Sequence, residues 1–457
     1  MGFRPSGLVA MGTVALLMSV ATQSNAQVGG GFGGVAVDGN KTLRTFRVDD
    51  PRGVLTRKKF AAAKAALDPD VARHSKLRKV SLTRLEKELA KLLAAGRGPT
   101  DEMNYLAGMT RIQYVFYYPE TKDIVIAGPA EGWATVAPGR VIGIETKRAT
   151  LELQDLVVAL RTFPPGKKGG HLVGCSIDPS REGLAKMQKF LRSIGSSARP
   201  GDAKRIVDGL RTSLGLHDVS VTGIPADTHA AQVLVEADYR MKLIGLGMER
   251  PKVRIKSYVD LANTSTIRRN AMQRWYFIPN YECVRVGDGG QAMELVGDSV
   301  QLVGENEVVL KDGTRKAAAL KNRASTAFTT GFTKLYGKLA DKTPVYAQLR
   351  NLIDLFVAAA FIQNEDYYGK AGWKMATLGD EDAFAVRTYQ APVHVETAVR
   401  AAWKGRTLVT PIGGGVMIKP RHALRSSNLL EDKDGAVAKT RASIDLSKLP
   451  AGTWWWD

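Results

Sequence analysis

Apolar residues recur at spacings of three and four along much of the chain, which places them on one face of an α-helix. This pattern predicts helices over residues 57–67, 83–96, 150–163, 179–195, 202–214, 227–244, 317–341 and 344–362. Thr83 and Glu86 have the spacing of a capping box at the start of the second of these helices. Residues 227–244 also contain a short β-branched run, but the helical spacing of Ala230, Leu234 and Ala237 favours a helix.

Runs of β-branched and aromatic residues between turn signals predict strands. They lie at residues 35–37, 43–46, 111–118, 123–127, 171–177, 219–221 and 409–419. The first two flank Asp38-Gly39-Asn40 and therefore predict a hairpin. Residues 274–310, where short apolar runs alternate with glycines, predict an antiparallel meander. Because helices mix with antiparallel strands without a regular βα alternation, the sequence predicts an α+β fold of two to three domains.

Glycine and proline clusters suggest where the domains begin and end. The expected division is a signal peptide at 1–26, a glycine linker at 27–34, an N-terminal α+β domain at 35–163, a second α+β domain at 171–315 that ends in the meander, and a helical segment with a C-terminal tail at 316–457. The tail ends in Trp454, Trp455 and Trp456. We expect these rings to pack on the protein's own surface, although ligand stacking is the alternative.

The first 26 residues have the three parts of a secretory signal peptide. Arg4 precedes an apolar stretch at 8–21, and small residues at 24–26 lead to Gln27. We expect cleavage between Ala26 and Gln27, and hence a secreted or periplasmic protein. The alternative, an uncleaved membrane anchor, needs an apolar stretch of ~20 residues, and this one is shorter.

No later segment is predicted to span a membrane. The nearest candidate, residues 349–362, is too short and contains Asp354. We expect Asp354 on the polar edge of a helix; the alternative is a buried carboxylate with a partner such as Arg350, one turn before it.

Positive charge is concentrated near the N-terminus of the expected mature chain. The whole chain has a formal net charge of +20, and residues 52–97 hold thirteen Lys or Arg against four Asp or Glu. This excess predicts a basic surface that includes Lys58, Lys59, Arg78 and Lys79. Its expected partner is an acidic polysaccharide, an anionic lipid or another polyanion. The alternative is a solvated face that only keeps the protein soluble.

The chain has few residues suited to redox or metal chemistry. Cys175 and Cys283 either form one disulfide in an oxidising compartment or remain two buried thiols. Two cysteines are too few for a Cys-type zinc site, and the six histidines never fall at i and i+4 of a predicted helix. We therefore predict no metal and no cofactor.

Three segments carry a resemblance to a known family. They are DIVIAGPAEGW at 123–133, CSIDPSREGL at 175–184 and ADYRMKLIGLG at 237–247. They resemble an uncharacterised exported family of planctomycete bacteria, domain of unknown function 1598. The resemblance implies a bacterial protein that acts outside the cytoplasm, and it carries no catalytic residue with it.

Two functions of different class fit the sequence. The first is a non-catalytic binding or structural protein of the cell envelope or extracellular space, with a basic surface. The second is an extracytoplasmic hydrolase, directed at a glycan, whose site is assembled from distant residues. For the second, Glu131 and Trp133 are the candidate residues, as acid and as a stacking ring.

Overall fold

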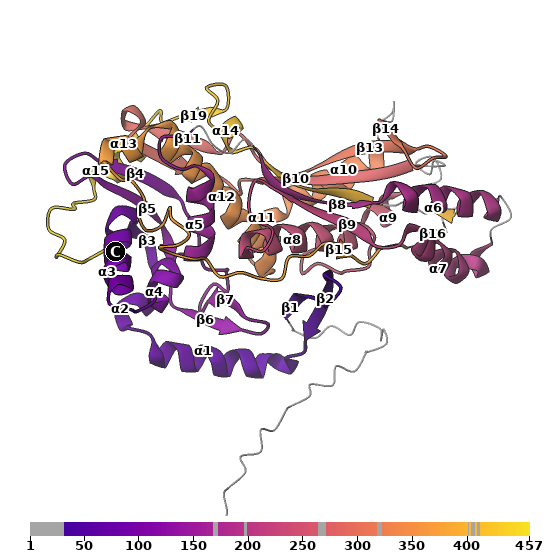
Figure 1. Cartoon of the computed structure of the whole chain (residues 1–457), viewed down its shortest axis with the longest axis horizontal. Helices are drawn as coiled ribbons and strands as arrows, with labels where there is room; N and C mark the ends of the chain where they lie inside the picture. The colour runs from indigo at the N-terminus through magenta and orange to yellow at the C-terminus, as the bar shows by residue number, and fades with distance from the viewer. Residues whose placement is uncertain are drawn as a thin grey trace, which may run out of the picture.

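The computed structural model describes residues 32–167, 172–195, 199–263, 271–317, 322–400, 402–403, 407–408 and 412–457. Two large mixed sheets form the frame, and helices pack on them (Figure 1). In Figure 1 the seven-stranded sheet lies at the left, the nine-stranded sheet extends to the right, and helix α12 lies between them. The predicted α+β class is confirmed.

The nine-stranded sheet brings together strands from both ends of the chain. In spatial order it consists of β1 (Phe32–Val37), β2 (Thr42–Val48), β15 (His394–Val395), β9 (His217–Thr222), β8 (Val173–Pro179), β18 (Ile412–Ile418), β10 (Ala271–Pro279), β13 (Val300–Val309) and β14 (Arg315–Ala317). β1 and β2 form the predicted hairpin. Two parallel contacts, β2 with β15 and β18 with β10, join antiparallel groups of strands.

The seven-stranded sheet is also assembled from distant segments. Its order is β19 (Leu429–Glu431), β11 (Val284–Gly287), β12 (Ala292–Leu295), β4 (Tyr114–Tyr118), β5 (Asp123–Ala130), β3 (Ser75–Ser81) and β20 (Trp455–Trp456). A separate two-stranded hairpin, β6 (Trp133–Val136) with β7 (Arg140–Gly143), follows β5, and β16 (Ala402–Trp403) pairs with β17 (Thr407–Leu408).

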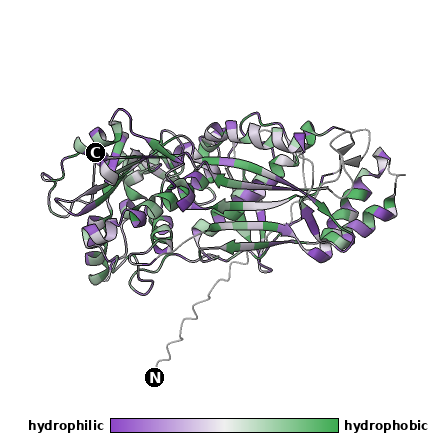
Figure 2. Ribbon diagram, turned by 90° about the horizontal axis from the view of Figure 1, so that it is seen from above, coloured by the Kyte–Doolittle hydropathy of each residue, from purple (hydrophilic) through white to green (hydrophobic). Residues whose placement is uncertain are grey.

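The longer helices are α1 (Val54–Ala66), α3 (Leu82–Ala94), α5 (Leu153–Thr162), α6 (Arg181–Ile194), α7 (Ala203–Leu214), α8 (His229–Gly245), α10 (Arg323–Lys334), α12 (Pro344–Asn364) and α15 (Ala436–Ala442). Eight of these nine longer helices overlap a predicted helix, and α15 has no predicted counterpart. The shorter helices are α2 (Pro69–Ala72), α4 (Asp101–Asn104), α9 (Tyr258–Leu261), α11 (Tyr336–Ala340), α13 (Tyr367–Ala371) and α14 (Pro420–Ala423). Figure 2 shows hydrophobic and hydrophilic residues alternating around the helices at the outer end of the nine-stranded sheet, as expected of amphipathic helices.

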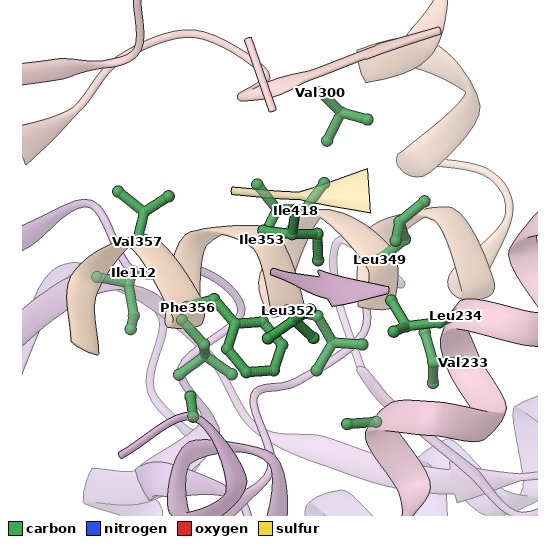
Figure 3. Close-up of a cluster of buried hydrophobic side chains, with 14 of the residues drawn as sticks. Ile112, Val233, Leu234, Val300, Leu349, Leu352, Ile353, Phe356, Val357 and Ile418 are labelled. Atoms are coloured by element: carbon green, nitrogen blue, oxygen red, sulfur yellow. The ribbon is translucent and has the colours of Figure 1, made fainter. Parts of the chain in front are cut away.

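Helix α12 is the centre of the hydrophobic core. It contacts α5, α8 and α14, and Figure 3 shows Leu352, Ile353 and Phe356 among side chains from α8, β13 and β18. Among the described residues α12 is the one helix long and apolar enough to cross a membrane, and it is buried inside the protein. A helix that is apolar all round must be covered on every side, and here the protein itself covers it.

Strands of different predicted domains pair in the same sheets. The hairpin of β11 and β12 pairs with β4 in the seven-stranded sheet, whereas β10 and β13, which flank it in sequence, pair in the nine-stranded sheet. The predicted meander at 274–310 is therefore wrong, because alternation identifies strands but not their partners. Both sheets combine strands from the 35–163, 171–315 and 316–457 segments. Of the predicted linker at 27–34, residues 32–34 begin β1 and the rest lies outside the described residues.

The predicted capping box at α3 is also wrong. Ser81 caps the helix by accepting from the Arg84 amide. Glu86 is buried, and its carboxylate accepts hydrogen bonds from the Trp373 indole and from the amides of Thr377 and Leu378. The Glu86 side chain therefore binds the distant segment around Trp373, and it does not cap α3.

Asp354 does not lie on a polar edge. Its side chain is fully buried, and Oδ2 accepts from Arg111 Nε at 2.8 Å. Arg350 instead lies 3.5 Å from Asp298. The partner of Asp354 therefore comes from the segment before β4, and not from its own helix.

The tryptophan tail packs on the protein itself, as expected. β20 pairs with β3, and the Arg78 guanidinium lies 4.7 Å from the centre of the Trp455 ring. Arg78 also donates to both carboxylate oxygens of Asp457. The last residues are thus held by a stacked cation and an ion pair.

We predict that Asp354→Ala lowers the free energy of unfolding by about 3–5 kcal/mol, because it leaves the largely buried Arg111 without its carboxylate. Denaturant unfolding of the purified protein measures the change. Asp341→Ala is the matched control, since it removes a half-exposed ion pair with Arg148 of the same 2.8 Å length and should cost only about 0–1 kcal/mol. Equal losses in the two variants would contradict the assignment.

Candidate functional site

A polar cavity of about 560 Å³ lies where several elements meet. It is lined by β1, the turn between β6 and β7, the first turns of α5 and α8, and the segment at 384–389. α12 contributes Gln348. The volume falls within the ~300–1,000 Å³ typical of small-molecule sites.

The first residue of α8 is the chemical centre of this cavity. Thr228 caps α8 by accepting from the Ala231 amide, so His229 is held at the first helical position. His229 Nδ1 lies 2.9 Å from Asp155 Oδ2, and its Nε2 lies 3.7 Å from Glu152 Oε1. Both carboxylates come from the start of α5, so two helix N-termini converge on one imidazole.

The surroundings of His229 change its protonation. Burial by itself lowers the pKa of His229, but the charges of Asp155 and Glu152 outweigh burial and raise it to about 9. Burial raises the pKa of Glu152, and the nearby Asp155 charge adds to this effect while His229 opposes it. At neutral pH the site therefore holds an imidazolium beside a carboxyl group that takes up a proton more readily than usual.

A second charged network forms another wall. Arg140 Nη2 donates to both oxygens of Glu236 at 2.5 Å, and Arg240 Nε donates to the same carboxylate at 2.8 Å. Arg140 also donates to the side-chain oxygen of Gln348, whose amide nitrogen lies 3.4 Å from His229 Nε2. The two networks thus meet at Gln348, and Glu236 is already fully engaged by two guanidinium groups.

Two tyrosines add aromatic surface. Tyr389 lies 6.0 Å from the His229 ring and its hydroxyl hydrogen-bonds with Gln154, which also donates to Glu152. Tyr105 lines the cavity and packs against Trp133 at 5.6 Å. Burial raises the pKa of both tyrosine hydroxyls, so they stay neutral hydrogen-bonding groups.

The cavity can therefore bind a polar ligand and exchange a proton with it. Its lining offers amides, carboxylates, phenols and an imidazolium, which together donate to and accept from hydroxyl groups. Within the described ranges no cluster of three or more His, Cys, Asp or Glu is arranged to hold a metal ion.

The predicted catalytic residues are not part of this chemistry. Glu131 is buried, and its carboxylate accepts from the amide of Glu145 and from the amide and hydroxyl of Thr146. Trp133 is buried too, and it supports Tyr105 from behind. The residue types of Glu131 and Trp133 suggested acid and stacking roles, but in the structure these side chains hold the β6–β7 hairpin in place.

The four predicted polyanion-binding residues do not form one surface. Arg78 is fully buried and donates to the carbonyls of Val71 and Ala107 as well as to Asp457. Lys79 is nearly buried in β3. Lys58 and Lys59 lie on α1 instead, where neither is buried. Arg78 and Lys79 in β3 therefore have a structural role. Of the four residues, only Lys58 and Lys59 on α1 are available to a partner.

The cysteines are two buried free thiols, so the predicted alternative of a disulfide is not present. Cys175 lies in β8 of the nine-stranded sheet, and Cys283 immediately precedes β11 of the seven-stranded sheet. The expected cleavage site at Ala26 and Gln27 lies outside the described residues.

No local pattern in the sequence pointed directly to the cavity. His229 was one of six scattered histidines, and its partner Asp155 is 74 positions away. The one available clue is Thr228 before a helical stripe, which predicts that His229 begins a helix.

Comparison with known proteins gives one match. Residues 175–258 match the family described as "Protein of unknown function (DUF1598)". This confirms the resemblance to that family over those residues, which include His229, Gln232 and Glu236 of the cavity. Searches of curated proteins and of solved structures found no match.

We predict that His229 makes stability depend on pH. Its pKa is raised in the folded state, so its contribution is complete below its ordinary value of 6.5 and is lost as pH rises through about 9. Between these two pH values the free energy of unfolding of the wild type should fall by roughly 2–4 kcal/mol more than that of His229→Gln. Denaturant unfolding at pH 6 and pH 9.5 tests this, and parallel curves for the two proteins would contradict it.

We also predict two titratable thiols per chain in denatured, unreduced protein, because both cysteines are free. In the native protein both should react slowly, since burial raises the pKa of each thiol. A colorimetric thiol assay with and without denaturant measures both values. Absence of thiols in the denatured sample would show a disulfide.

Proposed function

We propose that this chain, which carries a DUF1598 domain at residues 175–258, is an exported protein that binds a neutral saccharide unit in the cavity around His229. The proposal rests on the residues that line the cavity. Planar hydrogen-bonding side chains and two tyrosine rings surround one cavity of small-molecule size.

The polar groups suit a ligand with several hydroxyls. A carboxylate, an amide or a guanidinium presents two polar atoms side by side, which matches two neighbouring hydroxyl groups. Glu152, Gln154 and Gln348 provide such pairs. Because cations and anions both line the cavity, it does not favour a strongly charged ligand.

The aromatic groups suit the apolar face of a sugar ring. Tyr389 and Tyr105 contribute large side chains whose hydroxyls remain neutral. Arg387 lies 5.2 Å above the Tyr389 ring and supports its position. A site prepared in this way loses little conformational freedom on binding.

The exported location is part of the proposal and rests on the signal-peptide pattern of residues 1–26. A saccharide ligand is consistent with it, because glycans are abundant in the cell envelope and outside the cell. We therefore retain the proposal of a binding protein of the cell envelope, but we assign its binding site to the cavity and not to the basic region.

A second candidate function is hydrolysis of a bound glycan. It is favoured by Glu152, whose carboxyl group lies beside His229 and retains a proton more readily than usual because it is buried. Such a group can donate a proton to a leaving oxygen. Glu236 is a poor second carboxylate because two arginines already bind it.

Tyr389→Ala should weaken saccharide binding at least about tenfold, which corresponds to 1.4 kcal/mol, because one aromatic face of the site is lost. Calorimetry with ligands selected from a panel of neutral mono- and disaccharides measures the affinity. The control is Tyr281→Ala, which removes a half-buried tyrosine that packs on His422 outside the cavity. No binding by the wild type, or equal losses in both variants, would refute the proposal.

The same ligands distinguish binding from hydrolysis. Release of monosaccharide by the wild type, abolished by Glu152→Gln while binding persists, would establish the hydrolase. Stable binding without product supports the binding protein.

A further inference from the structure

Helix α1 is unusual among the long helices because none of its residues is buried. It packs on β6 and runs along the outside of the molecule (Figure 1). Its start is fixed by Asp50, whose carboxylate accepts from the amides of Leu55 and Thr56. The helix is therefore well defined at its N-terminus although it contributes no residue to the core.

Part of the positive charge of residues 52–97 is neutralised by ion pairs outside α1. Arg78 pairs with Asp457, Arg84 with Asp123 and Lys91 with Glu88. In the described part of the chain no ion pair involves Lys58, Lys59 or Lys64. The sequence of α1 contains four cationic residues and no acidic one. Of the cations in this region that make no ion pair in the described structure, four lie on α1, and the other five, Arg52, Lys76, Lys79, Lys87 and Arg97, lie on other elements.

Apolar side chains are exposed at the same place. Among the described residues six large hydrophobic side chains are exposed, and three of them are Phe46, Val54 and Leu55. Val54 is 45% and Leu55 44% exposed. Ala61, Ala62 and Ala65 continue the exposed apolar surface along α1. We refer to Val54, Leu55, Lys58, Lys59 and Lys64 as the α1 patch.

We propose that the α1 patch docks the protein on an anionic lipid surface. A membrane interface accepts cations at its headgroups and apolar side chains just below them, which matches both features of the patch. An acidic polysaccharide would use the lysines but would leave Val54 and Leu55 in water. The inference concerns a different surface from the saccharide cavity and does not depend on it.

The charge test uses the full chain with sedimenting vesicles of phosphatidylcholine, with and without about 30% phosphatidylglycerol. Binding is expected only with the anionic lipid, and it should weaken with salt. Replacing Lys58, Lys59 and Lys64 by Gln should reduce the affinity at least about tenfold. The matched control replaces Lys186, Lys189 and Lys204 by Gln, which removes the same charge from exposed positions on α6 and α7 and should reduce it less than about twofold.

A second variant separates lipid from polysaccharide. Val54→Ser with Leu55→Ser keeps every charge, and both positions are exposed, so the fold should persist, as circular dichroism can verify. This variant should bind anionic vesicles at least about threefold more weakly and retain full affinity for soluble dextran sulfate. Unchanged vesicle binding by this variant, or equal losses from the two lysine sets, would overturn the proposal in favour of a polysaccharide partner or of net charge alone.

Discussion

Burial of α12 is the constraint on which the rest of the structure depends. All but two of its 21 residues are buried. A fully buried large apolar side chain contributes roughly 1.5–3 kcal/mol, so no side of such a helix can be left in water without a large loss. Strands and helices from every part of the chain are consequently drawn around it (Figure 3). This one core contains residues of all three predicted segments, 35–163, 171–315 and 316–457.

The same packing creates the cavity. α5 and α8 both contact α12, and this arrangement brings their first turns together, with Glu152 and Asp155 on one side and His229 on the other. Gln348 projects from α12 into the gap between them. Polar groups at helix starts cannot enter an apolar core without partners, so they remain at its margin and line a cavity. The chemistry of the site is thus positioned by the hydrophobic core beneath it.

Local patterns predicted what depends on neighbours in sequence. Spacing and turn residues predicted the β1–β2 hairpin and the amphipathic helices α6 and α7. They also favoured a helix over a strand for the segment that forms α8. Sheet partners and buried charges did not follow, because they depend on contacts hundreds of residues apart. Glu86 bonds with Trp373, and Arg78 bonds with Asp457. A basic run in the sequence therefore overstated the surface charge.

The contrast between Glu131 and Glu152 shows why a site requires more than a suitable residue type. Glu131 is buried, and both of its carboxylate oxygens already accept hydrogen bonds from residues 145 and 146. Glu152 accepts from Gln154 on one oxygen, and its other oxygen faces His229 at 3.7 Å, beyond a normal hydrogen bond. A carboxylate that is fully satisfied stabilises the fold, whereas one that keeps a free acceptor beside a cavity can take up a ligand or a proton. That difference is set by three-dimensional packing, and it is the physical reason why the candidate site moves from Glu131 to Glu152 and His229.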